Sequence, residues 1–152
     1  MFVQDNTDLD LDNTDKVLLA AIVEFSGTGA QQFVITANAS SIFNLNSAAT
    51  AAKIFETNDR TKDHKSYDGN NPNVEAPINI YQKANAWMAI RLSGGSLSNA
   101  ATADSLGPNM LQTLAVSASF TVNPGRYTIQ LIGRGAGSKV TAKDRSMVIG
   151  VS

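Results

Sequence analysis

The chain has 152 residues, of which 43% are hydrophobic and 16% are charged, with a formal net charge of −1 and no cysteine. This length suits one domain whose core is large enough to fold without disulfides or a structural metal. The near-zero charge argues against a nucleic-acid partner, and the lack of cysteine excludes a disulfide scaffold and thiol chemistry. Frequent Gly, Ser, Asn and Thr are typical of an all-β protein with many turns.

The first residues, Met-Phe-Val-Gln-Asp-Asn, have neither the basic start nor the apolar stretch of a signal peptide. No apolar run approaches the roughly 20 residues that a membrane helix needs. We therefore expect a soluble protein that is made in the cytoplasm and has no membrane partner.

Residues 1–15 predict an acidic extended arm that precedes a single domain over 16–152. Aspartates recur along the arm among Asn and Thr, and Leu9 and Leu11 alternate with them. This pattern fits an edge strand or an extended tail. Because so polar a segment buries little by itself, we expect a neighbouring subunit or another partner to order it.

Residues 16–25 form the most apolar run, and periodicity alone does not separate a buried strand from a buried helix here. The β-branched and aromatic residues of this run, with the Ser-Gly-Thr-Gly turn at 26–29, favour a strand covered on both faces. Residues 31–39 alternate in polarity and predict its hairpin partner. A short strand or an irregular edge follows at 42–45.

The segment 47–56 is the only candidate helix, because Ser47 suits a helix cap and alanine is the best helix former. Ile54 and Phe55 fit the beginning of a strand equally well.

The middle of the chain then changes from loop to strand and back. Residues 57–76 predict a polar surface loop whose length indicates either function or mobility. Residues 77–92 predict a strand, and 96–112 predict a second loop.

Two alternating runs near the C-terminus give the clearest strand signals. Apolar residues recur at every second position of 116–122 and of 127–131, as in half-buried strands. Asn123-Pro124-Gly125 lies between them and has the residues of a tight turn. We therefore expect an antiparallel turn and a strand that returns across the sheet. A glycine-rich link leads to a last strand over 145–151.

Asp8-x-Asp10-x-Asp12 has the opening spacing of a calcium loop. Asn13 and Leu19, however, stand where an EF-hand needs glycine and glutamate. A solvated acidic arm is the better interpretation, with a weak cation site of another type as the alternative.

Residues 133–139 superficially match a phosphate-binding loop. Ser138 precedes Lys139 instead of following it, and the chain goes on as a strand instead of a helix. We expect a flexible hairpin loop here.

His64 is the only histidine and lies in the polar loop, so we expect it to be exposed to solvent. With no second histidine and no cysteine, transition-metal catalysis is not expected. Nothing in the local sequence selects a carboxylate pair. We therefore expect no enzyme, no catalytic residue, no cofactor and no metal, and a carboxylate-dependent glycoside hydrolase remains a third alternative.

Tyr67 and Trp87 are the candidate ligand contacts, because exposed aromatic rings stack on sugars. Core packing is the commoner role for an aromatic residue on a strand such as Trp87. Tyr67 lies beside Asp68 and Asn70 in the polar loop and is the slightly better candidate for carbohydrate contact.

Three segments near the C-terminus carry a resemblance to a known family: Phe120-Thr121-Val122, the run Pro124-Gly125-Arg126-Tyr127-Thr128-Ile129-Gln130-Leu131, and Arg145-Ser146-Met147-Val148-Ile149. Together they resemble the last strands of jelly-roll domains in bacteriophage tail-fibre, tail-tip and head-decoration proteins. These domains are similar in plan to complement-type and tumour-necrosis-factor-like trimeric heads.

The resemblance implies an all-β, antiparallel jelly-roll β-sandwich of about eight strands, assembled as a homotrimer. It implies a structural component of a virion that contacts other virion proteins and transfers no catalytic residue. The 152 residues include no collagen-like or coiled-coil stem, so we expect a capsid decoration or a compact fibre or tip subunit rather than a fibre shaft. The alternative function is a receptor- or carbohydrate-binding module, with a host-surface glycan held by the 57–76 and 93–112 loops.

Overall fold

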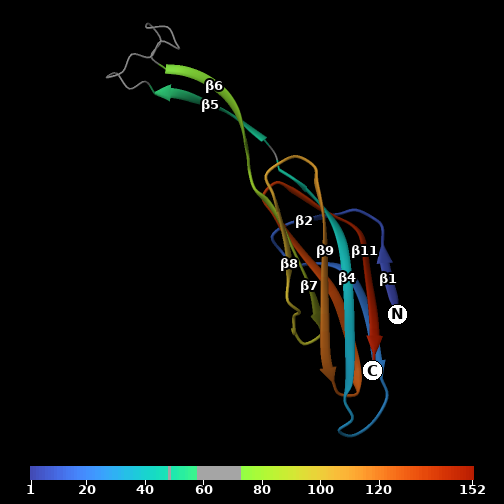
Figure 1. Ribbon diagram of the computed structural model, residues 1–152. Coiled ribbons are helices and arrows are strands. Elements are labelled where there is room, and N and C mark those ends of the chain that lie inside the picture. The colour runs from blue at the N-terminus through green and yellow to red at the C-terminus, as the bar shows by residue number, and fades with distance from the viewer. Residues whose placement is uncertain (48, 58–72) are drawn as a thin grey trace.

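The computed structural model describes residues 1–47, 49–57 and 73–152 (Figure 1). The described residues form strands and no helix, which confirms the all-β expectation. The strands are β1 (Phe2–Asp5), β2 (Leu9–Leu11), β3 (Lys16–Phe25), β4 (Phe33–Asn46), β5 (Ala49–Thr57), β6 (Asn73–Tyr81), β7 (Ala84–Leu92), β8 (Ala101–Ser105), β9 (Met110–Val122), β10 (Gly125–Ala136) and β11 (Lys139–Val151).

Two antiparallel sheets form the body of the molecule. The first has the order β1-β11-β4-β9, with β2 also paired to β11, and the second has the order β3-β10-β7-β8. Their inner faces meet in one hydrophobic core, as in a β-sandwich. Its fully buried side chains include Ile35, Phe43, Leu45, Met88, Ile90, Ile129, Leu131 and Met147. The third pair, β5–β6, projects as a ribbon from one end (Figure 1).

The two clearest strand predictions are confirmed. In β9 the even-numbered residues from Leu114 to Val122 face the core and the odd-numbered residues between them are exposed. In β10, Ile129 and Leu131 are fully buried. This alternation places one row of side chains in the core and the other row in solvent, as the period of two requires.

The predicted hairpins are wrong, because the connections lead from one sheet to the other. Asn123-Pro124-Gly125 joins β9 in the first sheet to β10 in the second, and Gly137-Ser138 joins β10 to β11 in the first. Likewise β3 pairs with β10 rather than with β4. Alternation locates a strand, but the choice of its neighbour depends on distant segments that bury the same core.

The strand over 16–25 is covered on one face only. Leu19, Ala21 and Val23 are buried, whereas Val17 is 44% exposed and Ile22 is 48% exposed. The prediction of a strand buried on both faces is therefore wrong, because the outer face of β3 has no layer over it within the described chain.

The candidate helix over 47–56 is also wrong, since β5 pairs with β6 from Ala49 opposite Tyr81 to Thr57 opposite Asn73. Its β-branched and aromatic residues suit a strand, and cross-strand pairing overrides the helix propensity of alanine.

Several predicted boundaries change as well. The segment 77–92 contains the end of β6 and all of β7, which belong to different sheets, and the segment 96–112 contains β8 and the beginning of β9 rather than one loop. In β8 the inward residues, Ala103 and Ser105, are small, so their alternation is easily missed. Of the predicted loop over 57–76, β6 occupies the residues from Asn73 onward, and 58–72 lie outside the described residues.

Gly137 and Gly29 share a backbone conformation, but of the two it is Gly137 that lies close to another segment of the chain. Gly137 and Gly29 have φ values of +92° and +93°, so alanine strains the backbone at both positions. A Cβ atom at Gly137 would overlap the carbonyl group of Lys83, whereas nothing lies within 4 Å of one at Gly29.

We predict that Gly29→Ala costs about 1–2 kcal/mol of unfolding free energy, the backbone penalty alone. Gly137→Ala will cost roughly 2 kcal/mol more, because the Lys83 backbone must also move. Urea denaturation of both variants measures the difference. Equal losses would contradict the close contact between the β10–β11 turn and Lys83.

Candidate functional site

The N-terminal arm is ordered by its own chain. β1 pairs antiparallel with β11, from Phe2 opposite Val148 to Asp5 opposite Arg145, and β2 pairs with the beginning of the same strand. The arm thus contains two edge strands, which was one of the two alternatives from the sequence. β11 takes the ordering role that we expected from a neighbouring subunit, so that expectation is wrong.

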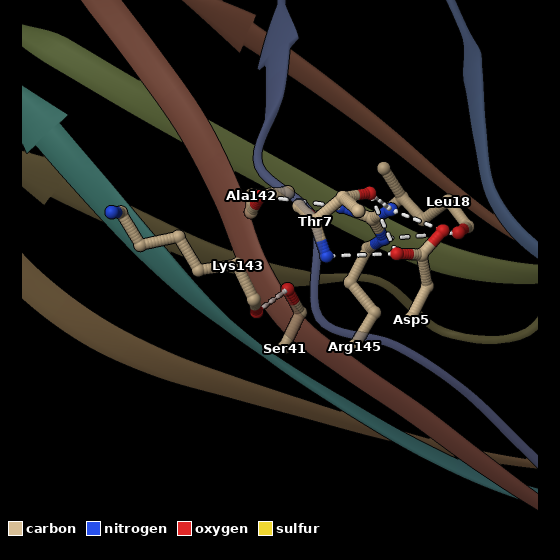
Figure 2. Close-up of polar contacts among 7 residues, drawn as sticks. All are labelled: Asp5, Thr7, Leu18, Ser41, Ala142, Lys143 and Arg145. Carbon is tan, nitrogen blue, oxygen red and sulfur yellow. Dashed lines mark hydrogen bonds and ion pairs between the residues drawn. The ribbon is translucent and has the colours of Figure 1, made fainter.

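A buried arginine fixes this arrangement (Figure 2). The side chain of Arg145 is 3% exposed. Its Nε donates to the Leu18 carbonyl at 3.0 Å, and Nη1 donates to the Thr7 carbonyl at 2.7 Å. Nη2 lies 3.0 Å from Oδ2 of Asp5. One guanidinium therefore joins the arm, β3 and β11, and its charge is both hydrogen-bonded and paired, as burial demands.

Two β-bulges bring these groups together. In β11 the register with β4 shifts between Lys143 and Ser146, so that Asp144 and Arg145 stand opposite Ser41. The extra residue turns Arg145 inward and places Asp144 at φ 44°, which aspartate tolerates. In β3 the register with β10 skips Leu18, the residue whose carbonyl accepts from Arg145.

The arm also carries two copies of Asp-Asn-Thr, at 5–7 and 12–14, that form the same local turn. The Thr7 amide and hydroxyl donate to Asp5 at 2.8 and 2.6 Å, and the Thr14 amide donates to Asp12 at 2.9 Å. The Thr7 hydrogen bonds, followed by the Arg145 charge, hold the pKa of Asp5 below its ordinary value. The Thr14 hydrogen bonds lower the pKa of Asp12 in the same way.

The aspartates of the former calcium-loop candidate have separate protein partners. Asp8 pairs with Lys143 at 3.2 Å, Asp10 accepts from the Thr141 hydroxyl at 2.9 Å, and Asp12 lies 3.7 Å from Lys16. In the described ranges, no three His, Cys, Asp or Glu side chains gather as ligands for a metal ion.

A second polar cluster lies on the outer face of the second sheet. Trp87 stands opposite Arg134, Ala89 opposite Ile132, and Arg91 opposite Gln130 on the neighbouring strands β7 and β10. Asp15 lies 3.1 Å from Arg134 Nε and 3.6 Å from Arg91 Nη1, so it bridges the two arginines across the middle pair. This bridge explains why Ala89 and Ile132, on an outer face, are fully buried.

The Trp87 pocket opens beside this cluster and has a volume of about 430 Å³. The guanidinium carbon of Arg134 lies 3.9 Å from the centre of the Trp87 ring, a cation–π contact. The end of the arm supplies one wall, because Gly135 donates its amide to the Asp12 carbonyl at 2.7 Å. The pocket is lined by Asn13, Asn85, Ala86, Trp87, Thr102, Asp104, Arg134, Gly135 and Ala136.

Of the two candidate ligand contacts, the structure places Trp87 half-buried in this pocket, and Tyr67 lies outside the described residues, as does His64. The sequence analysis did not identify Asp15, Arg91, Arg134 or Arg145 as site residues. An arginine within an apolar strand is the signal that marks Arg145, and the repeated Asp-Asn-Thr marks the arm turns. Arg134 and Asp15 have no local signal, because only sheet pairing brings them together.

We predict that Arg145→Met lowers the free energy of unfolding by about 3 kcal/mol, because it leaves the Thr7 and Leu18 carbonyls without donors. Arg126→Met, at an exposed position of β10, is the matched control and should change it by less than about 0.5 kcal/mol. Denaturant titration compares the two. An equal and small effect would show that the arm is held without Arg145.

The lowered pKa of Asp5 predicts an acid-sensitive arm. A carboxylate whose pKa is lower in the folded state stabilises that state above its ordinary pKa, and this contribution disappears as the pH falls through the lowered value. The unfolding free energy should therefore fall as the pH drops from about 5 to about 2, and fall less in Asp5→Asn. Glu24→Gln removes an exposed carboxylate elsewhere and serves as the control. Identical pH profiles for wild type and Asp5→Asn would contradict the prediction.

No helix in the described part of the chain is long and apolar enough to cross a membrane. No protein-family model matches the chain, and no curated protein sequence is similar to it.

Proposed function

We propose that the chain is a structural subunit of a phage or phage-like particle. It acts through homotrimer assembly and protein contacts, as a capsid decoration or a compact fibre or tip subunit, and not through catalysis. The observation that carries the proposal is an uncharged surface formed by two neighbouring strands of the first sheet, described below. The proposal that this particle is a virion rests on the resemblance of 120–131 and 145–149 to virion jelly-roll domains.

The strand pairing supports a jelly-roll topology for the sandwich. Without β1 and the β5–β6 ribbon, eight strands remain in the two sheets. The first of them pairs with the last, the second with the seventh, the third with the sixth, and the fourth with the fifth: β2–β11, β3–β10, β4–β9 and β7–β8. This nested pairing is that of an antiparallel ribbon wrapped around a barrel-like core, which is the plan of a jelly roll.

The neutral face, defined as the outward-facing residues of β4 and β9, supports self-assembly. Interfaces between proteins are depleted of charged residues at their centre. The neutral face has no charged residue and consists mainly of small polar ones: Val34, Thr36, Asn38, Ser40, Ile42, Asn44 and Asn46 on β4, and Leu111, Thr113, Ala115, Ser117, Ser119 and Thr121 on β9.

Neighbouring strands extend this surface with exposed apolar residues. Phe2 and Val148 stand opposite each other on β1 and β11 and are 59% and 50% exposed. The outer face of the second sheet differs, because Glu24, Arg91, Arg126 and Arg134 are spread over it. Contact through β4 and β9 is therefore the cheaper in desolvation, since it avoids these charges as well as Lys139 and Lys143 of the neighbouring strand β11.

The β5–β6 ribbon supports a role in a larger assembly. It has two strands and projects from the end of the sandwich (Figure 1). Two strands without a third strand or another covering layer are marginally stable in water. A neighbouring subunit or another virion protein would provide that layer in the particle.

A receptor- or carbohydrate-binding module is the second candidate function, and Trp87 favours it. Its ring is only partly buried and borders a pocket of about 430 Å³, a volume in the range of small-ligand sites. The two functions are compatible, because a virion subunit can also bind a glycan on its host.

We predict a trimer in solution, with a mass near three times 16.1 kDa. Ala115→Glu places a charge on the neutral face and should yield monomers, because the carboxylate would be buried without a partner. Ala20→Glu is the matched control, since Ala20 is exposed on β3 in the other sheet. Sedimentation equilibrium measures all three masses.

A wild-type monomer, or equal loss of assembly in both variants, would contradict this assignment of the interface. Mixing the trimer with bare capsids and with tails tests the particle role. A protein that binds neither would overturn it.

A further inference from the structure

The geometry points to a saccharide that carries a carboxylate as the ligand of the Trp87 pocket. This inference rests on the second candidate function, and it adds the chemical class of the ligand and the residue that selects it. Arg134 would bind the carboxylate, and the polar residues around it would bind the hydroxyl groups.

The charges around the pocket leave Arg134 incompletely neutralised. Asp15 is the carboxylate paired with Arg134, and it is shared with Arg91. The other nearby carboxylate, Asp104, pairs with Lys83 at 3.2 Å. Of the two charged residues that line the pocket, Asp104 is thus already paired, whereas Arg134 shares its carboxylate partner with a second arginine, which favours a ligand with a negative charge at Arg134.

Arg134 also has hydrogen-bonding capacity to spare. Its Nε approaches Asp15 as an ion pair without hydrogen-bond alignment, and no group in the described part of the chain accepts a hydrogen bond from its terminal nitrogens. The side chain is 42% exposed and is held against the Trp87 ring. A guanidinium that is fixed in place and has free donors is suited to bidentate binding of a planar carboxylate.

The rest of the lining suits hydroxyl groups. Asn13, Asn85 and Thr102 offer both donors and acceptors, and Asp104 offers acceptors, in the same pocket lining as Trp87. A sugar ring combines hydroxyls with an apolar face that packs on an aromatic side chain. A nucleic acid would instead need a run of cations along its phosphates, which the sequence does not supply.

Trp87 is the only tryptophan of the chain and reports on the pocket directly. The probes are oligosaccharides of uronic acid units and sialylated oligosaccharides, each compared with the same compound after its carboxyl groups have been reduced to alcohols. Binding is followed by Trp87 fluorescence and checked by calorimetry. We expect the acidic compounds to bind at least about 10-fold more tightly than the reduced ones, the scale of one charged hydrogen bond.

Arg134→Gln should lower the affinity for the acidic compounds by about 10-fold or more and abolish the preference over the reduced ones. Arg126→Gln, on the same strand and the same outer face but away from the pocket lining, is the matched control and should bind as the wild type does. Equal affinity for acidic and reduced saccharides, or no binding of any acidic saccharide to the folded protein, would overturn the proposal. Acetate or sulfate that binds as tightly as the saccharides would reveal an anion site without saccharide recognition and would also overturn it.

The solution mass of the wild type and of Arg134→Gln is measured in the same samples. A trimer that binds no acidic saccharide would overturn the ligand assignment and leave the assembly proposal intact. A monomer that binds acidic saccharides would overturn the assembly proposal and leave the ligand assignment intact.

Discussion

The need to satisfy one buried guanidinium organises the first sheet and the arm. Arg145 lies between the sheets, where a charge without partners would cost several kcal/mol. Its acceptors come from the turn after β1, from the bulge in β3 and from β11 itself. The two bulges and the course of the arm therefore all serve to place acceptors around the Arg145 guanidinium, whose contacts Figure 2 shows. The inward turn of Arg145 needs the extra residue of the β11 bulge, and the free carbonyl of Leu18 needs the bulge in β3.

The same arm connects this buried charge to the outer surface of the second sheet. After β2 the chain passes from the first sheet to the second. On the way the backbone carbonyl of Asp12 accepts a hydrogen bond from the Gly135 amide, and the Asp15 carboxylate bridges Arg91 and Arg134. The neutral face and the Trp87 pocket consequently lie on opposite outer faces of the sandwich. Assembly through one face leaves the other open to a ligand, so a single small domain has room for both proposed roles.

The sequence predicted what depends on neighbours along the chain and missed what depends on distant ones. The alternation of 116–122 and 127–131 identified strands, because period-two patterning is a local property. The pairing of β3 with β10, the strand at Ala49–Thr57 and the small-residue strand β8 are decided by partners at least 13 residues away. Trp87 was recognisable as a candidate because an aromatic ring on a strand can stack on a sugar. The grouping of Asp15, Arg91 and Arg134 depends on sheet register, which no local pattern reveals.

The nested pairing has a consequence for the order in which the molecule can fold. β11 is synthesised after every other strand of the sandwich, yet it occupies the middle of the first sheet, between β4 and the arm strands. Until it arrives, β4 has a neighbour on one side only, and β1 and β2 have none within the described chain. A growing polypeptide therefore exposes unpaired backbone along β4 and the core side of the second sheet for most of its synthesis. Closure waits for contacts of high sequence separation, which makes slow folding and a dependence on chaperones the expected behaviour in the cell.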